Sequence, residues 1–179
     1  MKNLLYASLV LALTACGDKA TEVPANQLAS NDFESVEGWM GDNTPPSLTR
    51  EKAHSGLYAI KVDPSNEFSM GYNNLLGKLS PSRISKLKLH AWVNVPTAGS
   101  NVLLITQITD PAKPGTPPIM WNATKLSEQA KTQNKWVEIN KEIELPANVM
   151  YTNRIQVYLW RPAGSETAFL DDLSIAKVN

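Results

Sequence analysis

The segment from Arg154 to Trp160 alternates two kinds of side chain at every second residue. The aliphatic set is Ile155, Val157 and Leu159, and the intervening set is Gln156, Tyr158 and Trp160. Side chains of a β-strand point to opposite faces in turn, so this pattern predicts a strand with one face in a core. Its other face carries two aromatic rings and an amide.

A second strand is predicted from Ala168 to Ile175, after the turn-prone residues 162–165. Strict alternation would place Phe169, Asp171 and Ile175 on one face, together with Leu173. A carboxylate among apolar side chains is costly unless it has a partner or a cation. We therefore expect Asp171 to have one.

Strand signals recur at short spacing along the chain, and most are bounded by Gly, Pro, Asn or Ser. They cover Ser47–Glu51, Leu57–Val62, Phe68–Tyr72, Ile84–Val95, Val102–Thr109, Trp136–Leu145, Arg154–Trp160 and Ala168–Ile175. Only Thr124–Lys131 has a helix-like composition, enough for about one turn. So many short strands predict an all-β domain of two sheets, a β-sandwich or jelly roll.

The N-terminus has the layout of a bacterial secretory signal, with Lys2 followed by an apolar run too short to span a bilayer. The sequence Leu13-Thr14-Ala15-Cys16 resembles the lipobox of bacterial lipoproteins, which implies a lipid on Cys16; the alternative is an ordinary signal peptide. We expect a signal peptide over residues 1–15, a tether over 16–29 and the domain over 30–179. Gly17 replaces the usual inner-membrane retention aspartate, which favours the outer membrane in a Gram-negative cell and leaves the side of the membrane open.

Composition excludes several classes of function. Acidic and basic residues balance at 17 each, so no net charge attracts nucleic acid. The chain has two histidines and one cysteine, and it lacks zinc-protease, phosphate-loop and Gly-x-Ser-x-Gly motifs. No pair of carboxylates stands out for glycoside hydrolysis. We expect a protein that is not an enzyme.

Five segments, in this order and spacing, resemble the carbohydrate-binding modules of families four, nine and twenty-two, which are jelly rolls of the galactose-binding type. These segments are Asn31–Glu34 with Gly38-Trp39, His54–Val62, Leu89–Val95, Lys135–Val137 and Phe169–Ile175. The resemblance covers about residues 31 to 175. It implies the same fold and a glycan ligand held in a cleft on one sheet.

The resemblance also implies a structural calcium ion. Its ligands would be Glu34 and Asp171, with backbone carbonyl groups near Phe33 and Ser55. A hard cation with oxygen ligands would also satisfy the carboxylate that alternation places among apolar residues. The alternative is that Asp171 meets a lysine or backbone amides.

Alternation along Lys86–Val95 leaves His90 and Trp92 on the polar face of that strand. If this strand shares a sheet with Arg154–Trp160, one face gathers His90, Trp92, Gln156, Tyr158 and Trp160. Rings and amides suit a sugar, because its C–H faces stack on rings while its hydroxyls need planar donors and acceptors. Trp92 is either a ligand residue or packed under a loop.

Trp121 follows the longest loop, Asp110–Pro118. This loop either forms a wall of the cleft or only connects two strands. Trp121 is accordingly either a clamp over the cleft or an anchor for the loop. We expect a lipid-anchored, non-catalytic protein that holds poly- or oligosaccharide at the cell envelope. The alternative is an envelope scaffold or adhesion protein that binds a protein partner through the same jelly roll.

Overall fold

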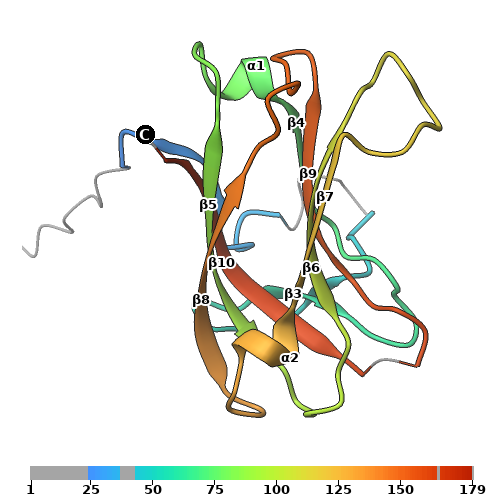
Figure 1. Ribbon diagram of the computed structural model, residues 1–179. Helices are drawn as coiled ribbons and strands as arrows, with labels where there is room; N and C mark the ends of the chain where they lie inside the picture. Colours follow the sequence, from blue (N-terminus) through green and yellow to red (C-terminus); the bar gives the residue numbers. More distant parts are fainter. Residues whose placement is uncertain (1–23, 37–42, 165, 179) are drawn as a thin grey trace, which may run out of the picture.

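The computed structural model describes residues 24–36, 43–164 and 166–178, and it shows two facing β-sheets with very little helix (Figure 1). The first sheet has the order β2-β3-β10-β5-β8, with β1 also paired to β10. Its strands are β1 (Gln27–Asn31), β2 (Leu48–Thr49), β3 (Ala59–Val62), β5 (Lys86–Asn94), β8 (Trp136–Glu144) and β10 (Ala168–Lys177). The predicted two-sheet, all-β architecture is confirmed.

The second sheet has the order β4-β9-β6-β7 and lies across the core from the first (Figure 1). Its strands are β4 (Tyr72–Leu75), β6 (Leu103–Thr109), β7 (Met120–Lys125) and β9 (Arg154–Trp160). Every pairing between these described strands is antiparallel. One face of an antiparallel sheet can be exposed to water, so the outer face of each sheet can carry polar side chains.

The core forms where the aliphatic faces of the two sheets meet. The aliphatic set of β9 is fully buried, as alternation predicts. The same holds for β5, whose inward side chains are Leu87, Leu89, Ala91 and Val93. Lys141 of the edge strand β8 lies opposite Leu89, at an inward position. A lysine at the inner side of an edge strand discourages a further strand from adding there.

Strand β10 departs from strict alternation. Its register against β5 shifts between Asp171 and Ser174, and Asp172 has a φ of 48°. The extra residue of this bulge reverses the faces, so Leu170 points into the core before it and Leu173 after it. Asp171 therefore does not share a face with Leu173 and Ile175. The prediction that it does is wrong, because alternation along a sequence cannot reveal a bulge.

Other local differences from the sequence predictions are small. The strands β1 and β7 were not predicted, and β4 begins at Tyr72, where the predicted strand ends. The first strand starts at Gln27, so residues 27–29 lie in the sheet and not in the tether. The short helices are α1 (Leu76–Leu79) and α2 (Leu126–Gln129), the latter inside the predicted helical turn. Neither of these helices, nor any other in the described part of the chain, is long and apolar enough to cross a membrane.

Gly71 lets the start of β4 approach β9 closely. A Cβ atom at Gly71 would lie 2.5 Å from the carbonyl oxygen of Val157 and 2.7 Å from Cβ of Tyr158. We predict that Gly71→Ala lowers the free energy of unfolding by about 1–3 kcal/mol, because the backbone must shift to relieve the overlap. Chemical denaturation measures this. Gly99→Ala is the matched control, since nothing lies within 4 Å of its Cβ position; equal losses in the two variants would contradict the prediction.

Candidate functional site

The outer face of the four-stranded sheet carries a row of polar and aromatic side chains that crosses all four strands. Asn73 of β4 pairs with Gln156 of β9, Gln156 with Gln107 of β6, and Gln107 with Trp121 of β7. Directly paired residues point to the same side of a sheet, so these four side chains form one line. The amide Nε2 of Gln107 donates to Oε1 of Gln156 over 2.9 Å, and this hydrogen bond holds both glutamine side chains in place.

Two further rows extend this line along the strands. Tyr158 pairs with Ile105, which pairs with Ala123; Trp160 pairs with Leu103. Ile105 is fully buried although it lies on the outer side, so neighbouring side chains cover it. We call the surface formed by Phe68, Asn73, Gln107, Trp121, Gln156, Tyr158 and Trp160 the aromatic face.

Trp160 is fixed in orientation by the segment that precedes β4. Its indole Nε1 donates to Oε1 of Glu67 over 3.0 Å, and the backbone of Phe68 forms a bridge with that of Trp160. The rings of Phe68 and Trp160 are parallel within 6°, with centroids 6.3 Å apart, and Trp121 meets Trp160 edge-on at 6.1 Å. Phe68 and Trp121 remain 53% and 47% exposed. Rigid rings that stay exposed are suited to stacking against a ligand.

A shallow hollow of about 260 Å³ lies on the aromatic face beside Tyr158. Its walls are Phe68, Ser69, Gly71, Tyr72, Asn73, Gln107, Gln156 and Tyr158. The hollow thus offers rings on one side and amides on the other. This is the combination of an apolar wall with few polar groups that ligand sites use.

The amides of the aromatic face are uncharged, and a guanidinium lies beside one of them. Nη1 of Arg154 donates to Oδ1 of Asn73 over 2.5 Å, so the guanidinium orients an amide. Burial raises the pKa of the Tyr158 phenol above its ordinary value, which keeps this hydroxyl protonated. The hollow therefore presents neutral donors and acceptors.

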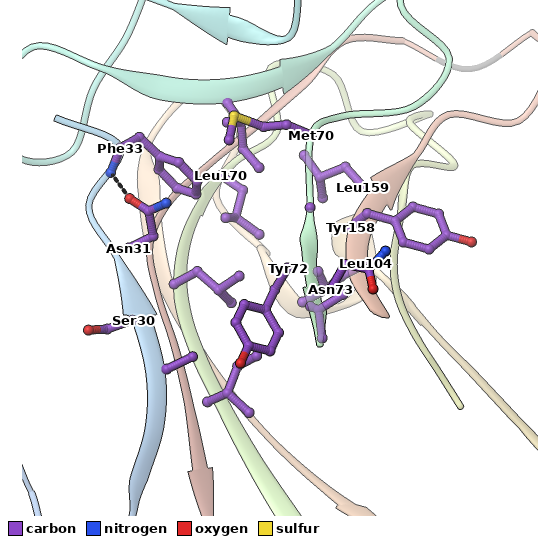
Figure 2. Close-up of a pocket in the computed structure, with 16 residues that line it drawn as sticks. Ser30, Asn31, Phe33, Met70, Tyr72, Asn73, Leu104, Tyr158, Leu159 and Leu170 are labelled. Atoms are coloured by element: carbon purple, nitrogen blue, oxygen red, sulfur yellow. Dashed lines mark hydrogen bonds between the residues drawn. The ribbon is translucent and has the colours of Figure 1, made fainter. Parts of the chain in front are cut away.

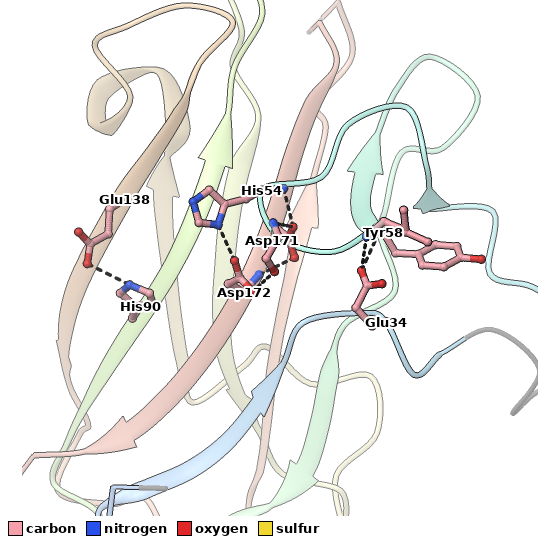
Figure 3. A network of polar contacts seen from close by, with 9 residues as sticks. Glu34, His54, Tyr58, His90, Glu138, Asp171 and Asp172 are labelled. Carbon is pink, nitrogen blue, oxygen red and sulfur yellow. Dashed lines mark hydrogen bonds and ion pairs between the residues drawn. The ribbon is translucent and has the colours of Figure 1, made fainter. Parts of the chain in front are cut away.

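Two of the predicted ligand residues, His90 and Trp92, are on the opposite side of the molecule. They belong to β5, which lies in the six-stranded sheet, whereas β9 lies in the four-stranded sheet. The prediction that one face gathers all five residues is wrong, because alternation gives the face of a strand and not the sheet to which the strand belongs. His90 is paired through Nε2 with Glu138 at 3.0 Å (Figure 3).

Trp92 is packed under a loop, one of the two roles predicted for it. The imidazole of His54 stacks on the Trp92 ring with centroids 3.8 Å apart and planes within 11°. Nδ1 of His54 lies 2.6 Å from Oδ2 of Asp172, and Trp136 meets His54 edge-on. The His54 loop therefore covers this end of the six-stranded sheet.

The residues predicted to bind calcium meet around the same loop (Figure 3). Asp171 is fully buried, and its Oδ2 accepts the backbone N–H groups of His54 at 2.7 Å and Ser55 at 3.2 Å. Oε1 of Glu34 accepts the N–H groups of Leu57 at 2.9 Å and Tyr58 at 2.7 Å. Both carboxylates thus bind one loop, and backbone amides satisfy Asp171 as in the alternative prediction.

The carboxylates of Glu34 and Asp171 offer oxygen atoms, the ligand type that a hard cation prefers. Burial raises the pKa of the Asp171 carboxyl above its ordinary value, against the effect of three backbone N–H donors. Asp172 adds a second negative charge beside it. No cluster of three or more His, Cys, Asp or Glu side chains able to hold a metal ion occurs in residues 24–36, 43–164 and 166–178. A calcium ion would therefore need backbone carbonyl oxygens in addition to Glu34 and Asp171.

A larger cavity of about 390 Å³ lies between the two sheets, where β1 faces β4. Figure 2 shows Phe33, Met70, Tyr72, Leu104 and Leu170 among the residues that line it. Its lining is mainly aliphatic and aromatic core residues. Asn31 and Asn73 supply its planar amides, and most of the other lining residues belong to the core. The aromatic face instead combines several amides with exposed rings, so it is the better candidate for a sugar.

Comparison with known proteins supports the fold assignment. No protein-family model and no curated protein sequence matches the chain. Among solved structures, the CBM22-1 xylan-binding domain from Paenibacillus barcinonensis Xyn10C is similar, with a TM-score of 0.51 and 18% identity over 86% of this chain and 95% of that one. The C-terminal family 22 carbohydrate-binding module of Clostridium thermocellum Xyn10B gives a TM-score of 0.51 and 13% identity, over 85% and 93% of the two chains.

A family 16 carbohydrate-binding module gives a TM-score of 0.50 and 14% identity, over 82% of this chain and all of that one. The chain has the jelly-roll fold of carbohydrate-binding modules. The fold resemblance expected from the sequence is confirmed.

Within this carbohydrate-binding-module fold, sequence reasoning missed part of the aromatic face. It identified Gln156, Tyr158, Trp160 and Trp121 but not Phe68. Phe68 was placed in a predicted strand, and the face to which it points was not predicted. It also missed Gln107, because the Val102–Thr109 strand has apolar residues at both parities. The pairing of Gln107 with Gln156 is a contact between distant segments, and a single sequence carries no signal for it. Cys16 and Trp39 lie outside the described residues.

Proposed function

We propose that the protein is a non-catalytic glycan-binding protein whose ligand lies on the aromatic face. The observation that carries this proposal is the line of Asn73, Gln156, Gln107 and Trp121 across four strands, bordered by the rings of Tyr158 and Trp160. A pyranose ring has C–H groups on its faces and hydroxyls around its edge. It needs flat apolar surfaces and planar polar groups side by side.

The similar structures support this proposal at the level of the fold. One of them is a xylan-binding domain, and another binds its ligand in a cleft. Function does not follow from fold alone, so the argument depends on the residues of this chain. The aromatic face presents rings that are exposed and held rigid, which lowers the entropy lost when a ligand binds.

The aromatic face also supports a role without catalysis. Glycoside hydrolysis uses two carboxyl groups on either side of the scissile bond. Among the described residues that wall the hollow, none carries a carboxyl group. The nearby carboxylate of Glu67 accepts the indole N–H of Trp160, which gives it a structural task.

The proposal places the protein at the cell envelope, anchored by a lipid on Cys16. The supporting observation is the sequence Leu13-Thr14-Ala15-Cys16 after a short apolar run. Residues between Cys16 and Gln27 would act as the tether, and the absence of aspartate at Gly17 favours the outer membrane in a Gram-negative cell. Such an anchor would keep a bound polysaccharide at the cell surface.

We include a structural calcium ion in the proposal. Glu34 and Asp171 would supply carboxylate oxygens, and backbone carbonyl groups near Phe33 and Ser55 would complete the coordination. Phe33 has a φ of 64°, so the chain turns sharply just before Glu34. The ion would neutralise buried charge at Asp171, which burial otherwise disfavours.

The first prediction concerns affinity for polysaccharide. We expect Trp160→Ala and Trp121→Ala each to weaken binding to soluble xylan at least about tenfold, because each removes an aromatic stacking surface from the site. Affinity electrophoresis in xylan-containing gels measures the change. Leu57→Ala is the control, because Leu57 is 64% exposed and belongs to the other sheet's loops.

No retardation of the wild-type protein by xylan or by any of a panel of plant and algal polysaccharides would contradict the proposed function. It would favour the alternative in which the exposed rings contact a protein partner.

The second prediction concerns calcium. We expect the melting temperature to rise with added calcium and to fall with a chelator, because a ligand that binds only the folded state stabilises it by about 2.7 kcal/mol at a hundred times its Kd. Differential scanning calorimetry measures both shifts. Glu34→Gln should remove most of the response, whereas Glu166→Gln, on the loop before β10, should leave it intact. An unchanged melting temperature in calcium and in chelator would rule the ion out.

The third prediction concerns the anchor. We expect the protein expressed with its own N-terminus to fractionate with membranes and to be labelled by a fatty-acid probe. Cys16→Ala should abolish the label and release the protein, because the thiol is the only acceptor in the sequence. Membrane fractionation with radioactive palmitate measures both. A variant that stays labelled would disprove lipidation at Cys16.

A further inference from the structure

A separate cleft of about 430 Å³ lies at the end of the sandwich that carries α1 (Figure 1). It forms between residues 76–84 and the loop that precedes β9. The backbone ties these segments together, since the N–H of Gly77 donates to the Tyr151 carbonyl at 2.8 Å and that of Leu76 to the Asn153 carbonyl at 2.9 Å. The cleft is therefore part of the folded frame.

The cleft has an apolar floor and an exposed aromatic rim. Leu76, Ile84 and Val149 form the floor and are only 4–6% exposed. On the rim, Tyr151 is 76% exposed and Met150 is 56% exposed. An exposed aromatic side chain beside an apolar floor is a combination that ligand sites use.

The position of Tyr151 is fixed by its neighbours. A Cβ atom at Gly77 would lie 3.0 Å from the Tyr151 carbonyl oxygen and 3.1 Å from its Cβ, so only glycine allows this approach without adjustment. The fully buried Asn153 closes the turn, with its Oδ1 accepting the Met150 N–H at 2.7 Å. The Tyr151 ring therefore projects from a rigid turn.

Arg83 supplies a positive charge to the same cleft. Its Nη2 donates to the carbonyl oxygens of Ala147 at 3.1 Å and Pro146 at 3.5 Å, which hold the guanidinium beside the opening. No carboxylate pairs with Arg83 among the residues that the structure describes. Its Nε and Nη1 groups have no hydrogen-bond partner among those residues, so each can donate to a ligand.

Other charged side chains near the cleft also favour a negatively charged ligand. Nζ of Lys177 donates to Oγ of Ser82 at 2.8 Å, which brings a second cation to the rim. The nearest acidic side chains on β8, Glu142 and Glu144, are both engaged by Lys86, at 3.5 and 2.9 Å. The cleft therefore favours an anion.

We propose that this cleft is a second binding site, which takes a uronic acid residue. The Tyr151 ring would stack on the C–H face of the sugar, and the guanidinium of Arg83 would form a charge-assisted hydrogen bond with its carboxylate. The hydroxyls of Ser80 and Ser82 lie on the same wall and suit the sugar hydroxyls. The aromatic face, which presents neutral amides, would take a neutral segment of glycan. The second site does not depend on that assignment.

The test is a titration of the full folded domain with glucuronate, followed by amide chemical shifts in NMR. We expect saturable shifts at residues 76–84 and 149–151 with a millimolar Kd. Arg83→Gln should weaken glucuronate binding at least about tenfold, because it removes a positive charge and a charge-assisted hydrogen bond. Tyr151→Ala should also weaken it, and glucose and acetate should each bind more weakly than glucuronate, since each lacks half of the recognised chemistry.

Two control variants keep the inference falsifiable. Lys88→Gln removes an exposed cation from the outer face of the six-stranded sheet and should leave glucuronate binding unchanged. Trp160→Ala should also leave it unchanged, although it weakens binding to xylan. Absence of shifts at the cleft, equal effects of Arg83→Gln and Lys88→Gln, or loss of glucuronate binding in Trp160→Ala would each overturn the second site.

The outcomes for the two sites are separable. Glucuronate binding at the cleft in a protein that fails to bind any neutral polysaccharide would support the second site and remove the function of the aromatic face. Binding of xylan without any response to glucuronate would support the function of the aromatic face and overturn the second site.

Discussion

The six-stranded sheet depends on the backbone pairing of β10, which joins β1, β3 and β5. These partners come from the beginning and middle of the chain, so the sheet is closed by contacts between its most distant segments. Loop-closure entropy must be lost before such distant segments can pair, and this slows folding. The bulge of β10 is part of the same constraint, because it turns Asp171 away from the core and places it under the His54 loop. Backbone amides of that loop then satisfy the carboxylate, so a buried charge fixes where the loop lies.

Strand β9 has the corresponding place in the other sheet, between β4 and β6. Its aliphatic side contributes Ile155, Val157 and Leu159 to the core. Trp160, on the opposite side, is not part of that core. Yet Glu67 and Phe68 both hold Trp160 in one orientation. Restraint of an exposed ring adds little to a core and much to a preorganised surface, which is the physical reason to assign this face to a ligand.

The sequence was sufficient to predict the faces of individual strands but not their arrangement. The two sides of β5 and of β9 follow from alternation, because a period of two is a property of the backbone. The partners of Trp92 and Tyr158 do not, since membership of a sheet depends on contacts between remote segments. This is why His90 and Trp92 were grouped with the rings of β9, although they lie on the opposite outer face. The bulge at Asp172 was equally invisible, because nothing local distinguishes it from an ordinary strand residue.

The two outer faces differ in a way that the fold alone does not require. On the six-stranded sheet, lysines and glutamates pair across strands, as Lys86 does with Glu144, and such pairs keep an antiparallel face solvated. On the four-stranded sheet the corresponding positions carry amides and rings, and the one guanidinium described there, that of Arg154, orients Asn73. Charged side chains hold water tightly, whereas rings and amides release it at lower cost. The sheet without paired charges among its described residues is therefore the one from which a neutral ligand can displace solvent. The proposed anionic ligand would gain most at Arg83, which pairs with no carboxylate in the described part of the chain.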